Sequence, residues 1–189
     1  MPARRDPEQL LDTALHAVSG LPEWQSVLNM LEVPIYITDE KGAVTFWNHA
    51  CVSFAGREPR LGQDRWCVTW QLYTLVGEPL AHEDCPMAQA IKTGKAVRDV
   101  VAIAERPDGS RLAFRPYPTP LFDNQGRLTG AINMLVDVTE EQSEALYDQA
   151  ECCRRLANAT YDRETSKVLG EMATGYDKTA KCLGDKRRS

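Results

Sequence analysis

The fold is decided by residues 98–139, RDVVAIAERPDGSRLAFRPYPTPLFDNQGRLTGAINMLVDVT, which hold three strand-like runs separated by two turns. The first run, 100–104, is apolar and rich in β-forming residues, and Asp108-Gly109 after it is a strong hairpin signal. The run 111–114 alternates polar and apolar residues, and after a second turn the run 128–138 is strand-like again. A charged, helix-favouring segment follows. The stretch therefore predicts a three-stranded antiparallel meander that leads into a helix.

The chain before this stretch predicts short helices and a further hairpin. Residues 6–31 show the apolar spacing of one or two amphipathic helices. Two β-rich runs, 33–38 and 43–47, are joined by an Asp-Glu-Lys-Gly turn and predict a hairpin. Asn48 is of a residue type that caps helices, so we expect it to begin a helix over 48–55.

The remaining segments are a loop-rich middle and a helical end. Residues 56–84 are interrupted by glycines and prolines, which predicts loops. A helix is expected from Asp84, as its cap, to Lys92, with a proline in its first turn. Residues 140–183 predict two helices with a break near 158–162, and the tail 185–189 is expected to be disordered.

In this order, the predicted elements resemble the PAS domain family. The resemblance covers 31–141, and its most specific segments are Ile35–Asp39 with Gly42, Phe46–Asn48, Pro107–Gly109 and Val136–Glu140. The segment from Trp66 to Ala88, with Tyr117–Leu121, is similar to PAS input modules of bacterial sensor histidine kinases. The resemblance implies an α+β PAS fold: a five-stranded antiparallel sheet with helices on one face, flanked here by N- and C-terminal helices. We therefore expect a helical extension at 1–31, a PAS domain at 32–141 and a C-terminal helical extension at 142–189.

Composition points to a globular protein outside the membrane. The chain has 189 residues, 43% hydrophobic and 26% charged, which fits one domain with appendages. Its net charge of −5 argues against nucleic-acid binding, which relies on clustered Lys and Arg. No apolar run approaches the roughly 20 residues of a membrane span, and the basic N-terminus has no apolar core behind it. The six cysteines lack the spacing of a disulfide scaffold. We expect a cytoplasmic protein.

The family binds ligands on the concave face of the sheet, which implies a candidate pocket. Strand alternation would place one set of side chains on that face, and the helices would close it with another set. A filled hydrophobic core is the alternative. The sheet residues expected there are Ile35, Ile37, Phe46, Ile103, Leu112, Phe114, Ile132 and Met134, and the closing residues are Phe54, Trp66, Trp70, Leu72, Met87 and Ile91.

The family's cofactors find little support in these residues. The segment Trp66–Gln71 matches the flavin-adduct motif of photoreceptor members only at Cys67 and Gln71, so flavin is not expected. The helix that usually supplies a haem ligand has no His, although Cys85, Met87 and the nearby His82 are able to bind iron. These residues therefore identify no cofactor, and haem stays open as one alternative.

Cys67, His82 and Cys85 form a weak metal-ligating pattern. His-x-x-Cys places two ligands within reach of one ion, and Cys67 would add a third. The same two cysteines are a candidate redox pair, and two buried thiols without chemistry are the remaining alternative.

Catalysis is not expected. The three histidines lie far apart, and neither a nucleophile elbow nor a phosphate-binding loop is present. Residues 140–189 contain no His to act as phosphoacceptor. The chain is therefore not expected to be an enzyme.

The C-terminal helices predict the output of the protein. Small and apolar residues recur there at steps of three and four, so each helix must bury a stripe against a copy of itself or its own domain. Such a helix is the usual signalling element of the family, with Asp137 and Thr139 as its hinge, where Asp137 either pairs with Arg98 or Arg115 or caps the helix. We expect a stand-alone bacterial sensor or adaptor that forms a homodimer and binds a signalling protein such as a kinase or regulator. A small ligand would gate it, and a metal- or cofactor-dependent redox or gas sensor is the alternative.

Overall fold

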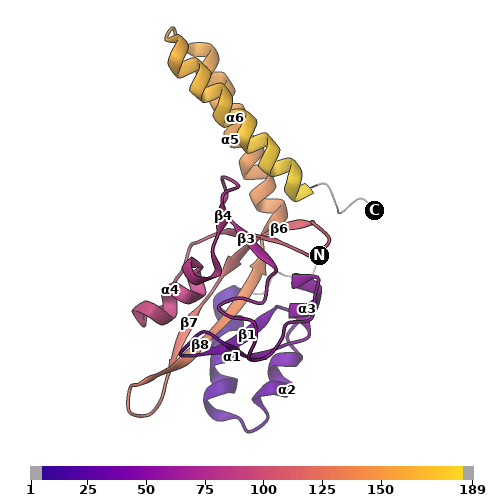
Figure 1. Ribbon diagram of the computed structural model, residues 1–189, viewed down its shortest axis with the longest axis vertical. Helices are drawn as coiled ribbons and strands as arrows, with labels where there is room; N and C mark the ends of the chain where they lie inside the picture. Colours follow the sequence, from indigo (N-terminus) through magenta and orange to yellow (C-terminus); the bar gives the residue numbers. More distant parts are fainter. Residues whose placement is uncertain (1–5, 185–189) are drawn as a thin grey trace.

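The computed structural model describes residues 6–184, which form an antiparallel sheet with helices on both faces and a helical hairpin that runs away from it (Figure 1). The helices are α1 (Pro7–Gly20), α2 (Trp24–Asn29), α3 (Ala50–Ala55), the 3-10 turn η1 (His82–Asp84), α4 (Pro86–Thr93), α5 (Thr139–Ala159) and α6 (Arg163–Gly184). The strands are β1 (Ile35–Asp39), β2 (Val44–Trp47), β3 (Gln71–Tyr73), β4 (Pro79–Leu80), β5 (Ala102–Glu105), β6 (Arg111–Pro116), β7 (Thr119–Phe122) and β8 (Leu128–Asp137).

The sheet has eight strands in the described part of the chain, where the sequence predicted five. Its order is β2-β1-β8-β6-β5-β3-β4, and β7 also pairs with β8. One extra strand arises because β6 and β7 share one edge of β8 and are interrupted at Pro116-Tyr117-Pro118. Proline has no N–H to donate, so a continuous ladder cannot run through this segment.

The other two extra strands lie in the segment predicted to be loop. β3 and β4 form a short hairpin, and β3 pairs with β5, Leu72 opposite Ala104. These strands have only three and two residues. No period of two can be recognised over so short a stretch, which is why the sequence pattern did not reveal them.

Two predicted helix caps are wrong. α3 begins at Ala50, after His49, and the Asn48 side chain instead lies buried among backbone groups. Its Oδ1 accepts a hydrogen bond from the Ile35 N–H at 2.9 Å, and its Nδ2 donates to the carbonyls of Leu28, Leu31 and Val33. Asn48 therefore ties the α2–β1 connection to the end of β2.

α4 begins at Pro86, with Cys85 rather than Asp84 at the cap position. Proline is well suited to the first helical position because its fixed φ is helical and its missing N–H is not needed there. Asp84 closes η1 instead, and α4 ends at Gly94 in a left-handed conformation.

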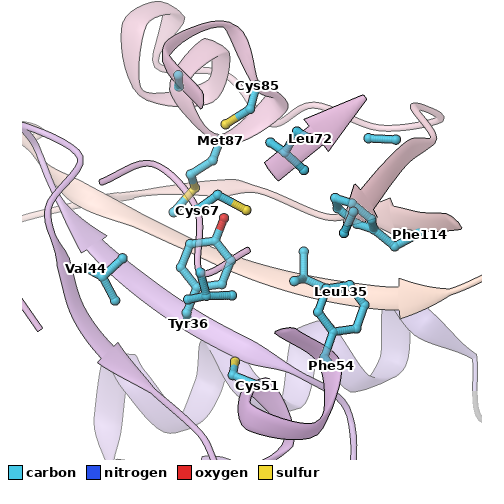
Figure 2. Close-up of a cluster of buried hydrophobic side chains, with 14 of the residues drawn as sticks. Tyr36, Val44, Cys51, Phe54, Cys67, Leu72, Cys85, Met87, Phe114 and Leu135 are labelled. Carbon is cyan, nitrogen blue, oxygen red and sulfur yellow. The ribbon is translucent and has the colours of Figure 1, made fainter. Parts of the chain in front are cut away.

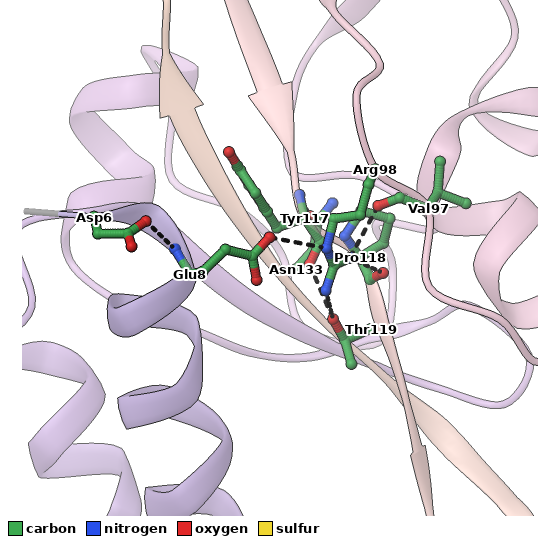
Figure 3. Close-up of polar contacts among 8 residues, drawn as sticks. All are labelled: Asp6, Glu8, Val97, Arg98, Tyr117, Pro118, Thr119 and Asn133. Atoms are coloured by element: carbon green, nitrogen blue, oxygen red, sulfur yellow. Dashed lines mark hydrogen bonds and ion pairs between the residues drawn. The ribbon is translucent and has the colours of Figure 1, made fainter.

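Each face of the sheet carries its own helices. One core lies under α3 and α4, and a second lies on the opposite face under α1 and α2. α1 is also held by an ion pair of 3.4 Å between Glu8 and Arg98, whose guanidinium donates to the carbonyl of Pro118 and to the Thr119 hydroxyl (Figure 3). Both faces of the central strands are therefore buried.

The C-terminal helices pair with each other within the chain. α5 and α6 are antiparallel neighbours whose facing side chains form a small core of Ala150, Cys153 and Ala173 (Figure 1). The predicted break is confirmed, since Asp162 caps α6 by accepting a hydrogen bond from the Thr165 N–H at 2.8 Å. Over residues 6–184, none of the helices has the length and apolarity that a membrane span requires. The predicted disordered tail, 185–189, lies outside the described residues.

Replacing Asn48 by Ala should destabilise the fold by about 3 kcal/mol, because the Ile35 N–H and the carbonyls that Nδ2 reaches would lose a buried partner. The free energy of unfolding in urea measures this. Asn124→Ala, in an exposed turn, is the matched control and should change it by less than about 0.5 kcal/mol. A loss below about 1 kcal/mol for Asn48→Ala would contradict the assigned role.

Candidate functional site

The core under α3 and α4 contains the residues nearest to the predicted pocket (Figure 2). Six of the fourteen predicted pocket residues lie in it as buried side chains: Phe54, Leu72, Met87, Ile91, Leu112 and Phe114. Trp66 is partly buried against it, whereas Trp70 is 51% exposed at its border. The phenyl rings of Phe54 and Phe114 meet edge to face, with centroids 5.4 Å apart. These side chains come from both the sheet and the helices, as expected, and whether they bind a ligand stays a prediction.

The other predicted sheet residues lie on the opposite face. Ile35, Ile37, Phe46, Ile132 and Met134 pack under α1 and α2, and Ile103 packs with the base of the helical hairpin. The expectation that all eight share one face is therefore wrong. Side chains alternate along a strand, so an error of one position moves a whole set to the other face.

Tyr36 occupies the place on β1 that the prediction gave to its isoleucine neighbours. Its side chain is fully buried, and the ring points into the core toward Cys67 (Figure 2). The hydroxyl donates to the Trp66 carbonyl at 2.9 Å and accepts from Asn133 Nδ2 at 3.0 Å. A buried tyrosine hydroxyl needs such partners, and burial raises its pKa well above the ordinary value. Tyr36 is thus the polar centre of an otherwise apolar core.

Asn133 continues this polar connection across β8. Its Oδ1 accepts from the N–H of Tyr117 at 2.9 Å, at the interruption between β6 and β7 (Figure 3). Tyr36 and Asn133 were not predicted as site residues. The available signal was the alternation itself, because a polar side chain within an apolar central strand must find a buried partner.

Trp66 links this core to the surface. Its backbone has φ of 67°, a left-handed conformation that is uncommon for a bulky residue. The indole lies directly over Gly42, where an added Cβ would fall 2.2 Å from Cε3 of the ring. The N–H of Trp66 donates to the Gly42 carbonyl at 2.7 Å. Position 42 therefore requires a glycine, because any side chain there would collide with the indole of Trp66.

The predicted metal ligands are not assembled into a site. Cys67 and Cys85 are both buried beside Tyr36, whereas His82 lies in η1 at the border of the core. Within 6–184, no group of three His, Cys, Asp or Glu side chains could hold a metal ion. The expectation of a three-ligand set is thus not met, because η1 turns the His82 side chain toward Arg57 and Asp64.

The Cys85 thiol is poorly suited to redox chemistry. Burial, and then proximity to Cys67, raise the pKa of Cys85 to about 12. The reactive form of cysteine is the thiolate, which is scarce at neutral pH when the pKa is so high. The Cys67 sulfur accepts a hydrogen bond from the Thr69 hydroxyl at 3.1 Å. This geometry favours the reading of both residues as buried structural thiols.

The predicted hinge joins β8 to α5. The Thr139 hydroxyl accepts from the Ala113 N–H at 3.0 Å and donates to the Ala113 carbonyl at 3.3 Å. Asp137 Oδ1 accepts from the Thr139 N–H at 2.9 Å, while Val138 holds the cap position of α5. The two arginines considered as its partners are engaged elsewhere, Arg98 with Glu8 and Arg115 with Glu141. The start of α5 is therefore fastened to β6.

Comparison with known proteins gives one family. A family model described as PAS domain matches residues 32–140. No curated protein matches. Solved structures that are similar in fold include a LOV protein of Rhodobacter sphaeroides, with 12% identity, a TM-score of 0.49 and coverage of 97% of this chain and all of that one.

Two further solved structures are similar in fold and differ in how much of each chain is covered. The light-state dimer of the fungal blue-light photoreceptor Vivid has 16% identity and a TM-score of 0.45 over 71% of this chain and 96% of that one. An RNA-binding light-oxygen-voltage receptor has 18% identity and a TM-score of 0.48 over 92% of this chain, which spans only 39% of that receptor.

The stability of the fold should fall at alkaline pH. Burial raises the pKa of the Cys51 and Cys85 thiols to about 12, from an ordinary value of 9.0. The unfolded chain releases these protons first, so the contribution of these thiols to stability is constant below about pH 8 and falls as pH rises from 9 toward 12. Each thiol contributes a slope of up to about 1.4 kcal/mol per pH unit.

Urea unfolding at a series of pH values measures this slope. Cys51→Ala should flatten it, and Cys152→Ala, which removes an exposed thiol, should leave it unchanged. Equal slopes in the wild type and Cys51→Ala would show that burial does not raise the pKa of Cys51.

Proposed function

Because the chain belongs to the PAS domain family, we propose that it is a sensor or adaptor protein of bacterial signal transduction that signals through its C-terminal helices. Residues 32–141 would be the sensory domain, 1–31 a helical extension whose helices α1 and α2 pack on its second face, and 142–189 the output. The role is non-catalytic. In support, the three histidines belong to three different elements, in α1, before α3 and in η1.

The observation that carries this proposal is the way both ends of the hairpin meet the sheet. Leu146 of α5 and Ala180 and Leu183 of α6 pack in one core with Ile103 and Ala113, on the face away from α3 and α4. Thr139 adds its two hydrogen bonds to Ala113. A shift of β5 or β6 must therefore displace the base of the hairpin.

A continuous path leads from the candidate site to this base. Tyr36 contacts Asn133 in the middle of β8, and β8 ends at Asp137, two residues before the fastened Thr139. Ligand binding shifts such an element only by its different affinity for two states. The six core residues with Trp66 and Trp70 remain the proposed sensory residues.

The output surface is a side of the hairpin that its own chain leaves uncovered. Val168 and Met172 of α6 are 49% and 43% exposed and lie one turn apart on the same face. Leu156 of α5, 53% exposed, lies on the same side of the antiparallel pair by its helical spacing. We propose that a second copy of the chain covers this side and forms a four-helix bundle. A kinase or regulator would then recognise the dimer.

Thr139→Val should loosen the hairpin from the sheet, because valine keeps the shape of threonine but leaves the buried Ala113 N–H without its partner. Hydrogen exchange measured by mass spectrometry should quicken at least tenfold in the first turns of α5. Thr129→Val, at an exposed position of β8, is the control and should leave exchange in α5 unchanged. Unchanged exchange in Thr139→Val would contradict the fastening role.

Met172→Glu should convert the dimer into a monomer, because it places a charge in the apolar interface. Light scattering on a sizing column should give twice the 21.1 kDa chain mass for the wild type and the single mass for the variant. Thr174→Glu is the control, since two positions along a helix lie about 200° apart. A monomeric wild type would refute the dimer.

A further inference from the structure

A surface pocket borders the sensory core and is lined by two segments, 57–70 and 81–83. Its volume is about 610 Å³. Trp66 and Cys67 stand between this pocket and the core around Tyr36. The pocket therefore lies where a bound molecule would touch the polar connection to β8.

The pocket holds more positive charge than its carboxylates balance. Arg57 pairs with Asp64 at 2.8 Å, both side chains being about five-sixths buried, and Asp64 also accepts from the backbone N–H of Arg60. Asp64 is thus committed to Arg57. Within the described chain, the guanidinium of Arg60 has no hydrogen-bond or ion-pair partner, and Arg65 donates to the carbonyl of Lys41 only. Glu83 also lines the pocket, so its three arginines exceed its two carboxylates by one charge, in a chain whose net charge is −5.

Two buried polar atoms of the pocket walls also lack partners. They are Nε of Arg57 and Nε2 of His82. Burial, and then the charge of Arg57, lower the pKa of His82, which favours the neutral imidazole. Buried polar atoms are almost always hydrogen-bonded in folded proteins. Unpartnered atoms at this place indicate a site completed by a polar molecule.

The same pocket presents flat apolar surface. Trp70 is 51% exposed, which is unusual for the largest apolar side chain, and Trp66 is fixed against Gly42 in its left-handed conformation. The guanidinium of Arg65 lies 5.7 Å from the ring centroid of Trp66. Indoles offer large faces for stacking with planar rings at little cost in conformational entropy.

We propose that this pocket binds a small planar aromatic compound that carries a carboxylate or phosphate group. Arg60 and Arg65 bind the anionic group, since guanidinium matches both anions with paired N–H donors. Trp70 and Trp66 cover the ring. The site is inferred on the premise of the sensory role above, and it gives the sensed molecule a chemical class and a place outside the core.

Calorimetric titration with four probes tests the class of ligand. Indole-3-acetate and adenosine monophosphate each combine a planar ring with an anion, whereas indole-3-ethanol lacks the anion and inorganic phosphate lacks the ring. At least one of the first two should bind saturably, ten times or more tighter than both of the last two. Whichever binds identifies the anionic group. Failure of both aromatic anions, or equal binding of inorganic phosphate, would overturn the inference.

Variants test the residues. Arg60→Gln, and the double change with Arg65→Gln, should weaken binding at least tenfold, and so should Trp70→Ala. Arg127→Gln removes an exposed arginine of a distant turn and is the matched control that should bind as the wild type does. Circular dichroism shows that each variant is folded. Unweakened binding in the double variant would overturn the site.

Hydrogen exchange of the hairpin with the bound probe separates this inference from the sensory proposal. Binding without any change in α5 and α6 keeps the site and refutes the proposed signalling route. Absence of binding, with the effect of Thr139→Val intact, refutes the site alone.

Discussion

Strand β8 is hydrogen-bonded along both edges and covered on both faces, and the other elements are placed by this double burial. β1 pairs with one edge, and β6 and β7 share the other. At Gly130 the backbone of β1 comes so close that an added Cβ would lie 1.9 Å from the Thr38 carbonyl oxygen, so no side chain fits there. Ala131 and Leu135 face the core under α3 and α4, while Ile132 and Met134 face α1 and α2. β8 thus has four neighbours, one at each edge and one on each face. A change at any one of them acts on a strand that the other three hold in place.

The same double burial explains which parts of the fold the sequence could predict. The turns at Asp108-Gly109 and 123–126 identified the meander, because turn residues act locally and need no tertiary context. The face of each strand was not predictable in this way. In β1, Ile35 and Tyr36 are equally buried on opposite sides, since α1 and α2 cover a face that would be polar in a sheet exposed on one side. In the sequence, only the tyrosine hydroxyl distinguishes the side chains on one face of β1 from those on the other.

The hairpin shows a different limit of prediction. The spacing of apolar residues predicted two amphipathic helices, but a stripe does not reveal whether its partner belongs to the same chain. In the structure the stripe of each helix, with Ala150 and Ala173, is covered by the other helix. The ion pair of 2.6 Å between Arg154 and Asp177 crosses the two helices, although exposed pairs of this kind contribute little to stability because solvent screens them. Apolar contact therefore holds the hairpin, and the side with Met172 stays exposed in the single chain.

The candidate site was predictable by different signals in its core and at its border. Periodic strands and helices identified Leu112, Phe114 and Met87. The pocket beside Trp66 is built from irregular segments, where residue type alone pointed to Trp66, Trp70 and His82 and the spacing did not predict a pocket. A filled apolar core resists small displacements, because its packing would be lost before a ligand's contacts were gained. A molecule that binds at the border avoids this cost, since it meets Trp66 from outside. Trp66 is itself held by the Tyr36 hydroxyl, and Tyr36 is held by Asn133 of β8. These contacts alone do not couple the pocket to β8. Coupling requires that the connection from Trp66 through Tyr36 to Asn133 have two arrangements. The left-handed backbone of Trp66 is a conformation that the surrounding contacts, with Gly42 and with Tyr36, must maintain.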